Sequence, residues 1–280
     1  MAGSKFAYVK GFEIPDPLLP ETFLVCRLDG HAFHRFSDQH DFVKPNDERA
    51  LKLMDHVAKN LMSEYKDIVL GFGESDEFSF LLKKSTKLYN RRHAKILTTL
   101  TSYFTSCYVF LWSQYFPDTP LRYPPSFDGR IVVYPNERII RDYFSWRQAD
   151  THINNLYNTV FWALVQQGKQ STTEAHATLK GTVSATKHEI LHSRFGINYN
   201  HLNERFRKGS VIVREELSPD SSLTHTETTK TLADGCSDVE ATNDPPVVKK
   251  KSTFKTMINI LHCDIIGDEF WNARPYILSQ

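Results

Sequence analysis

The chain has few cysteines, almost no excess charge and no long apolar run. Its 280 residues include four cysteines, and none has the C-x-x-C spacing that is typical of a structural zinc site. Cys26 and Cys107 lie inside apolar patterns, which indicates buried thiols in a reducing compartment. The formal net charge of +1 excludes a globally basic nucleic-acid binder, although it allows a local basic face.

No apolar segment approaches the length of a membrane span, and charges occur early at the N-terminus, without the apolar core of a secretory signal. We therefore expect a soluble protein with no membrane partner, located in the cytoplasm with the nucleus as a second compartment. A chain of 280 residues can form one large domain or two modest ones with real cores.

Two acidic loops, each preceded by an apolar run, carry the main chemical signal. The run at 23–28 ends at Asp29-Gly30, and the run at 68–73 ends at Glu74-Ser75-Asp76-Glu77. Short β-rich runs bounded by glycine and acids predict buried strands, and the residues between them show helical spacing behind an Asn46-Asp47-Glu48 start signal. Strand, helix and strand in that order predict two parallel strands, neighbours or nearly so. Asp29 would then face Asp76 at one sheet edge.

Two converging carboxylates suit Mg²⁺, which takes oxygen ligands and completes its shell with water and substrate phosphates. The alternative is that residues 74–77 form only a hairpin tip, and for an isolated acidic turn the two interpretations are evenly matched.

A second helix is predicted after this hairpin, with one apolar stripe from Ala94 to Tyr115. Its first turns carry Arg91, Arg92 and Lys95, although cations at a helix N-terminus oppose the helix dipole. Beside free N–H groups these side chains would instead bind phosphate, and their closeness in sequence to the acidic turn favours a triphosphate pocket over a solvated basic patch.

A further strand at 129–134 completes the order β-α-β-β-α-β, which is the ferredoxin-like arrangement of an α+β fold. Metal carboxylates at the end of the first strand and in the next hairpin are the layout of a polymerase or cyclase palm with two metal ions. We expect the palm-like catalytic core over 1–136 and a helical extension with a strand over 137–216. We expect a disordered insert over 217–252, which has few large apolar residues, and a strand and short helix over 253–280 that pack back on the core, the strand pairing as a hairpin with 210–214.

The predicted helix over 137–167 contains His152-Ile153-Asn154-Asn155-Leu156-Tyr157-Asn158. Asparagine is a poor helix former, and amides mixed with aromatic residues suit hydrogen bonding and stacking on nucleic acid. The alternative, which composition alone favours, is a polar seam between helices.

Several long motifs occur in a characteristic order. They are Arg27-Leu28-Asp29-Gly30, Phe33-His34-Arg35-Phe36, Lys44-Pro45-Asn46-Asp47, Glu74-Ser75-Asp76-Glu77, Tyr123-Pro124-Pro125, Phe127-Asp128-Gly129-Arg130, the segment 152–158, and His262-Cys263-Asp264-Ile265-Ile266-Gly267-Asp268. In these motifs the chain resembles the tRNA-histidine guanylyltransferase family of eukaryotic type, over residues 1–216 and again over 262–268, with the insert at 217–252 outside the resemblance.

The resemblance implies addition of one guanylate to the 5′ end of tRNA for histidine, opposite to the usual direction of polymerisation. The 5′-monophosphate is first adenylylated with ATP, the 3′-hydroxyl of GTP then attacks and releases AMP, and pyrophosphate is removed later. It also implies a homotetramer built from two dimers.

The resemblance further implies that Asp29 and Asp76 are catalytic and ligate two Mg²⁺ ions together with the Gly30 carbonyl. The nucleotide-binding residues that it implies are Asp29, Gly30, His31, Ala32, Phe33, His34, Lys44, Asp47, Ser75, Asp76, Arg92 and Lys95. Those implied to handle the tRNA end are His152, Asn155, Lys187 and Asn198.

Two other functions fit parts of the pattern. A nucleotide cyclase shares the palm and its carboxylates, but it needs no polynucleotide and leaves the segment 152–158 unexplained. A non-catalytic RNA-binding module would not need to keep Asp29 and Asp76 together.

Overall fold

The structure is a computed structural model that describes residues 4–216 and 256–279. The insert predicted over 217–252 lies outside the described residues. The chain divides into two compact units, one of residues 1–213 with 258–280 and one of residues 214–257. None of the helices in the described ranges is long and apolar enough to cross a membrane.

A single sheet organises the fold, with the strand order β4-β1-β3-β2-β5-β6. Its strands are β1 (Phe23–Gly30), β2 (Ile68–Glu74), β3 (Glu77–Leu82), β4 (Phe127–Tyr134), β5 (Ser210–Glu216) and β6 (Thr256–Leu261). β1 pairs antiparallel with both β3 and β4, and β2 pairs antiparallel with β3 and β5. β1 and β2 therefore run parallel to each other with only β3 between them, which confirms the predicted crossover.

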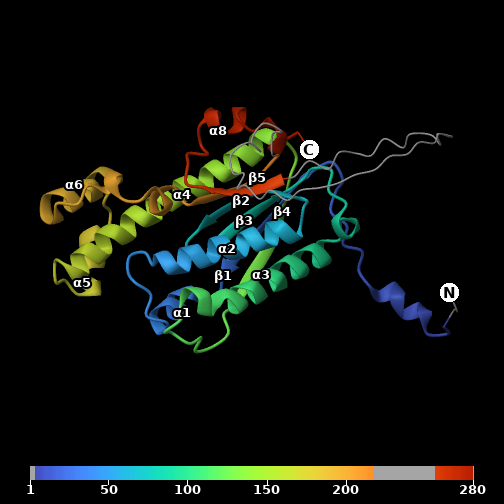
Figure 1. Ribbon diagram of the computed structural model, residues 1–280, viewed down its shortest axis with the longest axis horizontal. Coiled ribbons are helices and arrows are strands. Elements are labelled where there is room, and N and C mark those ends of the chain that lie inside the picture. The colour runs from blue at the N-terminus through green and yellow to red at the C-terminus, as the bar shows by residue number, and fades with distance from the viewer. Residues whose placement is uncertain (1–3, 217–255, 280) are drawn as a thin grey trace, which may run out of the picture. The chain divides into compact units, whose positions relative to one another are not determined.

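Helices cover both faces of this sheet (Figure 1). α2 (Glu48–Glu64) and α3 (His93–Tyr115) pack on the face that receives Leu24, Cys26 and Leu28 of β1. α4 (Glu137–Gln166) and α8 (Asp268–Asn272) pack on the other face, which receives Phe23 and Val25. Because successive strand residues point to opposite faces, both faces are apolar and β1 reads as a continuous hydrophobic run.

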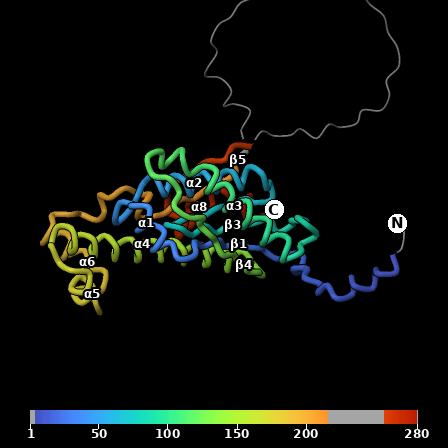
Figure 2. Tube along the Cα trace, turned by 90° about the horizontal axis from the view of Figure 1, so that it is seen from below, coloured from blue at the N-terminus to red at the C-terminus, as the bar shows by residue number. Residues whose placement is uncertain are grey.

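The second half of α4 leaves the sheet and forms a separate core with α5 (Thr172–Leu179) and α6 (Ser184–Phe195). Both views place α5 and α6 at this end of α4 (Figures 1 and 2). The predicted helix at 137–167 is confirmed to within one residue at each end, and α5 and α6 lie in the region that was predicted as a helical extension. Two short helices, α1 (Phe33–Gln39) and α7 (Glu204–Lys208), were not predicted, because neither is long enough to show a helical period. Short 3₁₀ turns occur at Ala7–Phe12, Leu88–Arg91, Tyr199–His201 and Pro275–Ile277.

The start of α3 is capped from a distant part of the chain. The Ala94 N–H donates to one carboxylate oxygen of Asp16 at 2.6 Å, and Arg92 Nε donates to the other at 3.2 Å. An acidic side chain therefore lies at the helix N-terminus where a phosphate was expected to bind.

Arg91 has a structural role beside this cap. The residue is only 8% exposed, and its guanidinium donates to the carbonyls of Leu19 at 2.6 Å and Thr22 at 3.1 Å. Thr22 directly precedes β1, whereas Asp29 lies near the other end of that eight-residue strand. At about 3.3 Å per residue, β1 separates the start of α3 from Asp29 by roughly 20 Å.

Arg91→Ala should lower the free energy of unfolding by about 3 kcal/mol, because it leaves buried carbonyl groups without donors. Arg92→Ala removes a half-exposed ion pair and should change it by less than about 1 kcal/mol. Urea unfolding of both variants measures the difference. Equal destabilisation by the two substitutions would contradict the structural role assigned to Arg91.

Candidate active site

Asp29 and Asp76 meet because of the strand register. Asp29 lies opposite Glu77 on β3, and Glu74 pairs with Glu77, so Ser75 and Asp76 form a two-residue turn between β2 and β3. Ser75 adopts a left-handed backbone with φ +49°, an uncommon conformation for a residue other than glycine. The Gly30 N–H donates to the carbonyl of Asp76 at 3.1 Å, which ties this turn to the end of β1.

Gly30 also lets the Asp76 side chain lie against the main chain. A Cβ atom at position 30 would be 2.7 Å from Asp76 Oδ2, and closer still to the ring of Phe33. Only glycine therefore allows a carboxylate at this distance from the β1 backbone. The close approach brings Asp76 beside the main chain that the resemblance assigned to metal binding.

The four acidic residues near this turn differ in their partners. Arg147 of α4 lies 3.1 Å from Glu77 and 3.8 Å from Glu74, and Arg27 lies 3.7 Å from Glu77. Within the described ranges, no lysine or arginine forms an ion pair with Asp29 or Asp76. The arginines therefore offset the negative charges of the two glutamates but not those of the two aspartates.

Burial and mutual repulsion disfavour the charged form of these acids. Burial raises the pKa of Asp76 to about 6, and the nearby charge of Asp29 acts in the same direction. Burial likewise raises the pKa of Glu74 to about 7. A cation between Asp29 and Asp76 would offset this cost.

The residues present fit a divalent metal ion. Two half-buried carboxylates beside main-chain oxygens are the donors that Mg²⁺ prefers. The described residues contain no group of three His, Cys, Asp or Glu side chains that could hold a metal. The rest of its coordination shell would therefore come from main-chain oxygen, water or a substrate phosphate, which suits a substrate-binding metal.

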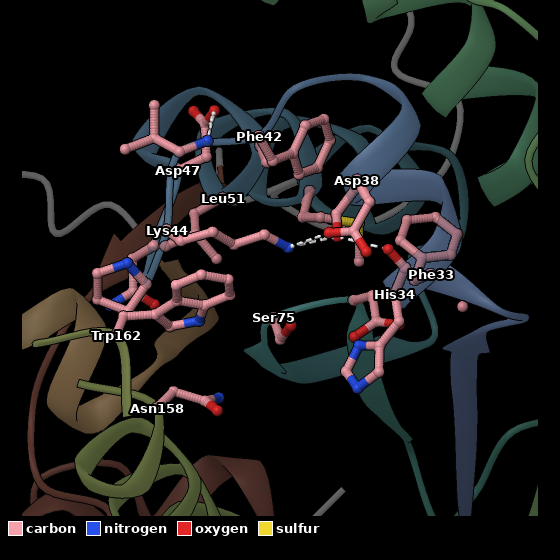
Figure 3. A pocket seen from close by; sticks show the side chains of 18 of the residues that line it. Phe33, His34, Asp38, Phe42, Lys44, Asp47, Leu51, Ser75, Asn158 and Trp162 are labelled. Carbon is pink, nitrogen blue, oxygen red and sulfur yellow. Dashed lines mark hydrogen bonds and ion pairs between the residues drawn. The ribbon is translucent and has the colours of Figure 1, made fainter. Parts of the chain in front are cut away.

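Two cavities of about 690 Å³ and 460 Å³ adjoin this turn and share Asp76, Ser75, His34 and Asn158 in their walls. In Figure 3, His34 and Asp38 face Trp162 and Asn158 across the first cavity, with Ser75 between them. Either cavity alone has the size of a typical small-molecule site. The shared wall places the Asp76 turn between two sites.

Most of the residues assigned to nucleotide binding gather here. Those that line the first cavity are Gly30, Ala32, Phe33, His34, Lys44, Asp47, Ser75 and Asp76, and Asp29 lines the second. Lys44 Nζ lies 2.9 Å from Asp38 and 5.8 Å from the ring centroid of Trp162. His31 is exposed and lines neither cavity, while its N–H donates to the carbonyl of Ser126.

Asp47 shapes the cavity wall rather than offering a free carboxylate. Its oxygens accept from the N–H groups of Val43 at 3.0 Å and Arg49 at 2.9 Å, and they form an ion pair with the Arg49 guanidinium at 2.7 Å. These bonds cap α2 and hold the loop at 43–47 in place. They lower the pKa of Asp47 although burial opposes them.

Arg92 and Lys95 do not reach this site in the same chain. They lie at the start of α3, roughly 20 Å along β1 from Asp29, and neither lines a cavity described here. Arg92 and Lys95 follow the acidic turn closely in sequence but not in space. The reason is that β3 runs back from the acidic turn to the opposite end of the sheet before α3 begins. Asp16 also occupies the N–H groups that were expected to bind phosphate.

The residues assigned to the tRNA end gather around Tyr199, except Lys187. Asn155 accepts from Asn46 at 2.9 Å and donates to Tyr199 at 3.0 Å, so it forms the polar seam that composition favoured. His152 packs against the rings of His188 and Tyr199, and burial lowers its pKa. Asn198 accepts from Asn200 next to Tyr199, whereas Lys187 donates to the carbonyl of Thr182.

One wall of the first cavity contains two residues that were not predicted from the sequence, Trp162 and His176. Asn158 and Trp162 of α4 line it together with Tyr157 and with His176 of α5. Tyr157 and His176 are joined by a hydrogen bond of 2.8 Å. The i,i+4 spacing of Asn158 and Trp162 was the available signal, since such residues share a helix face.

Comparison with known proteins identifies the family. The family model described as "tRNAHis guanylyltransferase" (Thg1) matches residues 6–135, and the Thg1 C-terminal domain matches residues 138–267. The chain belongs to the Thg1 tRNA(His) guanylyltransferase family. It is 49% identical to the tRNA(His) guanylyltransferase of Schizosaccharomyces pombe over 99% of this chain and 98% of that one. It is 52% identical to a probable tRNA(His) guanylyltransferase of Drosophila melanogaster over 100% of this chain and 87% of that one.

Solved structures of the family share the fold. The tRNA(His) guanylyltransferase from Saccharomyces cerevisiae aligns with a TM-score of 0.72 and 53% identity, over 75% of this chain and 93% of that one. A bacterial Thg1-like protein in complex with ATP aligns with a TM-score of 0.68 at 20% identity, over 98% of this chain and 96% of that one. This second likeness concerns the fold alone.

The raised pKa of Asp76 makes a prediction for the metal-free protein. Folding raises this pKa from 3.8 to about 6, so the folded state gains stability as the pH falls from 6 toward 4 and loses it as the pH rises through 6. Asp76→Asn should therefore be more stable than the wild type at pH 7.5, by at most roughly 3 kcal/mol, and the gain should shrink by pH 4.5. Urea unfolding in the presence of a chelator tests this, and equal stability at pH 7.5 would contradict it.

Proposed function

We propose that the chain is a tRNA(His) guanylyltransferase that adds a guanylate to the 5′ end of tRNA in the 3′–5′ direction. The main support is the pair Asp29 and Asp76, in a chain of the Thg1 family. Among the described residues these two carboxylates form no ion pair, and Asp76 lines both cavities while Asp29 lines the second. Relatives of nearly the same length carry the name of this activity. Bacterial Thg1-like proteins of the same fold have been solved with ATP and with GTP.

The reaction needs two nucleotidyl transfers. In the first, an oxygen of the tRNA 5′-phosphate attacks the α-phosphorus of ATP, which forms an adenylylated end and releases pyrophosphate. In the second, the 3′-hydroxyl of GTP loses its proton and attacks the activated 5′-phosphate, which releases AMP. Pyrophosphate is then removed from the triphosphate of the added guanylate. Mg²⁺, two ions per site, would neutralise phosphate oxygens and ease deprotonation of the hydroxyl.

The residues of the chain have separate tasks in this proposal. Asp29, Asp76 and the Gly30 main chain would hold the cations. The Asp76 turn lies between the two cavities, where the nucleotide phosphates and the 5′-phosphate of the tRNA can both be reached. His34 and Ser75 line both cavities and offer hydrogen bonds to phosphate oxygens. Lys44 lies over the Trp162 ring in the first cavity and adds a positive charge there.

Further features of the chain belong to the same proposal. The β-α-β-β-α-β part is a ferredoxin-like palm over 1–136, extended by 137–216 and by 253–280, with the insert at 217–252 between them. The protein acts on tRNA for histidine as a homotetramer built from two dimers, in the cytoplasm and the nucleus. His152, Asn155, Lys187 and Asn198 contact the tRNA end in this proposal, which follows the resemblance, and three of them, His152, Asn155 and Asn198, gather around Tyr199.

A nucleotide cyclase is the second candidate, since it uses a similar palm. The wall of asparagine and aromatic side chains from α4 argues against it, because a cyclase has no polynucleotide to bind. Two incubations with labelled GTP separate the two functions. Cyclic GMP formed from GTP alone would support the cyclase, and label transfer to 5′-monophosphorylated tRNA in the presence of ATP would support the transferase.

Asp29→Ala and Asp76→Ala should each reduce guanylate addition at least 1,000-fold without loss of the fold, because each removes a shared cation ligand. The assay uses 5′-monophosphorylated tRNA for histidine, ATP and labelled GTP. Asp128→Ala is the matched control, because Asp128 lies opposite Asp29 on β4 but is exposed and pairs with Arg130. Either site variant with more than about a tenth of wild-type turnover at saturating Mg²⁺ would refute the assignment.

The position of Arg92 and Lys95 makes a prediction about assembly. If they bind nucleotide, they must serve the site of another subunit, because about 20 Å separates them from Asp29 of their own chain. Arg92→Ala and Asp76→Asn should then each be inactive alone, while a mixture reassembled into tetramers should recover about a quarter of wild-type turnover per chain. A tRNA with a 5′-triphosphate, which bypasses adenylylation, shows which transfer is restored.

If the two variants are shown to have exchanged subunits and the mixture still recovers no activity, the idea of shared sites is contradicted. Full activity of Arg92→Ala alone would show that this cation has no role in the reaction.

A further inference from the structure

The second cavity gathers more acid than two aspartates. Its walls include Asp29, Asp55, Glu74, Asp76, Glu77 and Asp150, and of these Asp55 forms an ion pair with Arg205. A divalent cation that met all of these carboxylates would have several competing positions. In the described structure, ion pairs with arginine occupy most of the competing carboxylates.

Glu77 is the most direct competitor. It lies opposite Asp29 across the antiparallel pair of β1 and β3, so both side chains project from the same face, with Cβ atoms roughly 5 Å apart. By position alone, Glu77 would be a third cation ligand beside Asp29. Instead, both of its carboxylate oxygens lie 3.1 Å from Arg147 Nη1.

Arg147 is held on several sides at once. It is 4% exposed, and besides Glu77 it contacts Asp150 at 3.0 Å through Nη2 and Glu74 at 3.8 Å through Nη1. Its guanidinium also stacks on the ring of Trp146, with 3.6 Å to the centroid. A planar guanidinium satisfies these contacts together, whereas a lysine ammonium has no face to stack and no fork.

We propose that Arg147 is a positioning residue that withdraws Glu74 and Glu77 from the divalent cation, so that the cation meets Asp29 and Asp76 alone. This rests on the proposed function only in that the site holds such a cation. Arg147 comes from α4, whose later turns line both cavities, so the same contact fixes that wall against the acidic turn. Without it, the cation would settle on the wrong carboxylates and turnover would fall.

Mn²⁺ binding to the nucleotide-free protein, followed by the electron paramagnetic resonance signal of free Mn²⁺, tests this directly. Arg147→Met should bind Mn²⁺ at least tenfold more tightly or take up an additional ion per chain. Turnover should fall at least tenfold, while the KM for GTP changes less than threefold. The triple variant R147M/E74Q/E77Q should return Mn²⁺ binding to the wild-type value, because it removes both released acids.

Arg141→Met is the matched control. Arg141 is also on α4, pairs with Asp268 and lies over the ring of Trp271 at 5.8 Å, but it lines neither cavity. It should leave Mn²⁺ binding and turnover unchanged. Unchanged Mn²⁺ binding in folded Arg147→Met would overturn the proposal, whatever reaction the protein catalyses.

A second comparison decides the matter if Arg147→Met does not fold. Glu77→Gln keeps the shape of the side chain, and in the wild-type background it should leave Mn²⁺ affinity within twofold, whereas Asp76→Asn should lower it at least tenfold. An equal loss in the two variants would show that Glu77 is a cation ligand and would overturn the proposal.

Discussion

The register of β1 against β3 is the constraint on which the site depends. It sets Asp29 opposite Glu77, and the two-residue turn then leaves Asp76 beside Gly30. A slip of one residue would turn Asp29 toward α2 and α3 and place Leu28 at the site. The register is secured by the apolar side chains on both faces of β1, since a slip would exchange the contents of two cores. The position of the chemistry is therefore a consequence of packing along the whole strand.

The second constraint is electrostatic and links the two halves of the family pattern. The region at 6–135 supplies the acidic turn, and the region at 138–267 supplies Arg147, which neutralises part of it. Removing one partner of a buried ion pair leaves an uncompensated charge, which costs more than the intact pair contributes. The palm-like part and α4 are thus mutually dependent at the site, in addition to the hydrophobic core that they share on the Phe23 and Val25 face of the sheet. Both cavities have walls from both regions, so neither region forms the site by itself.

The sequence predicted the strands, the long helices and the meeting of Asp29 with Asp76, because hydrophobic period and strand order are local signals. It did not predict α1 or α7, which are too short for a period to show. It could not predict that Asp47 is occupied by Arg49 and Val43, since a motif indicates a residue's identity but not which of its hydrogen bonds are already made. The role of Arg147 could not be predicted for a related reason: Glu74 and Glu77 are about 70 positions away from it in the sequence, and no spacing rule connects them to it.

The cations at the start of α3 show where reasoning by neighbourhood in sequence stops. They are close to the acidic turn in sequence, but β3 lies between them and places them at the opposite end of the sheet. The N-terminus of α3 is already capped, because Asp16 accepts a hydrogen bond from the Ala94 N–H that a phosphate would otherwise receive. Arg92 keeps a half-exposed guanidinium there although its ion pair contributes little stability. A side chain that neither stabilises the fold much nor reaches its own active site is understandable if its task lies in the assembled protein.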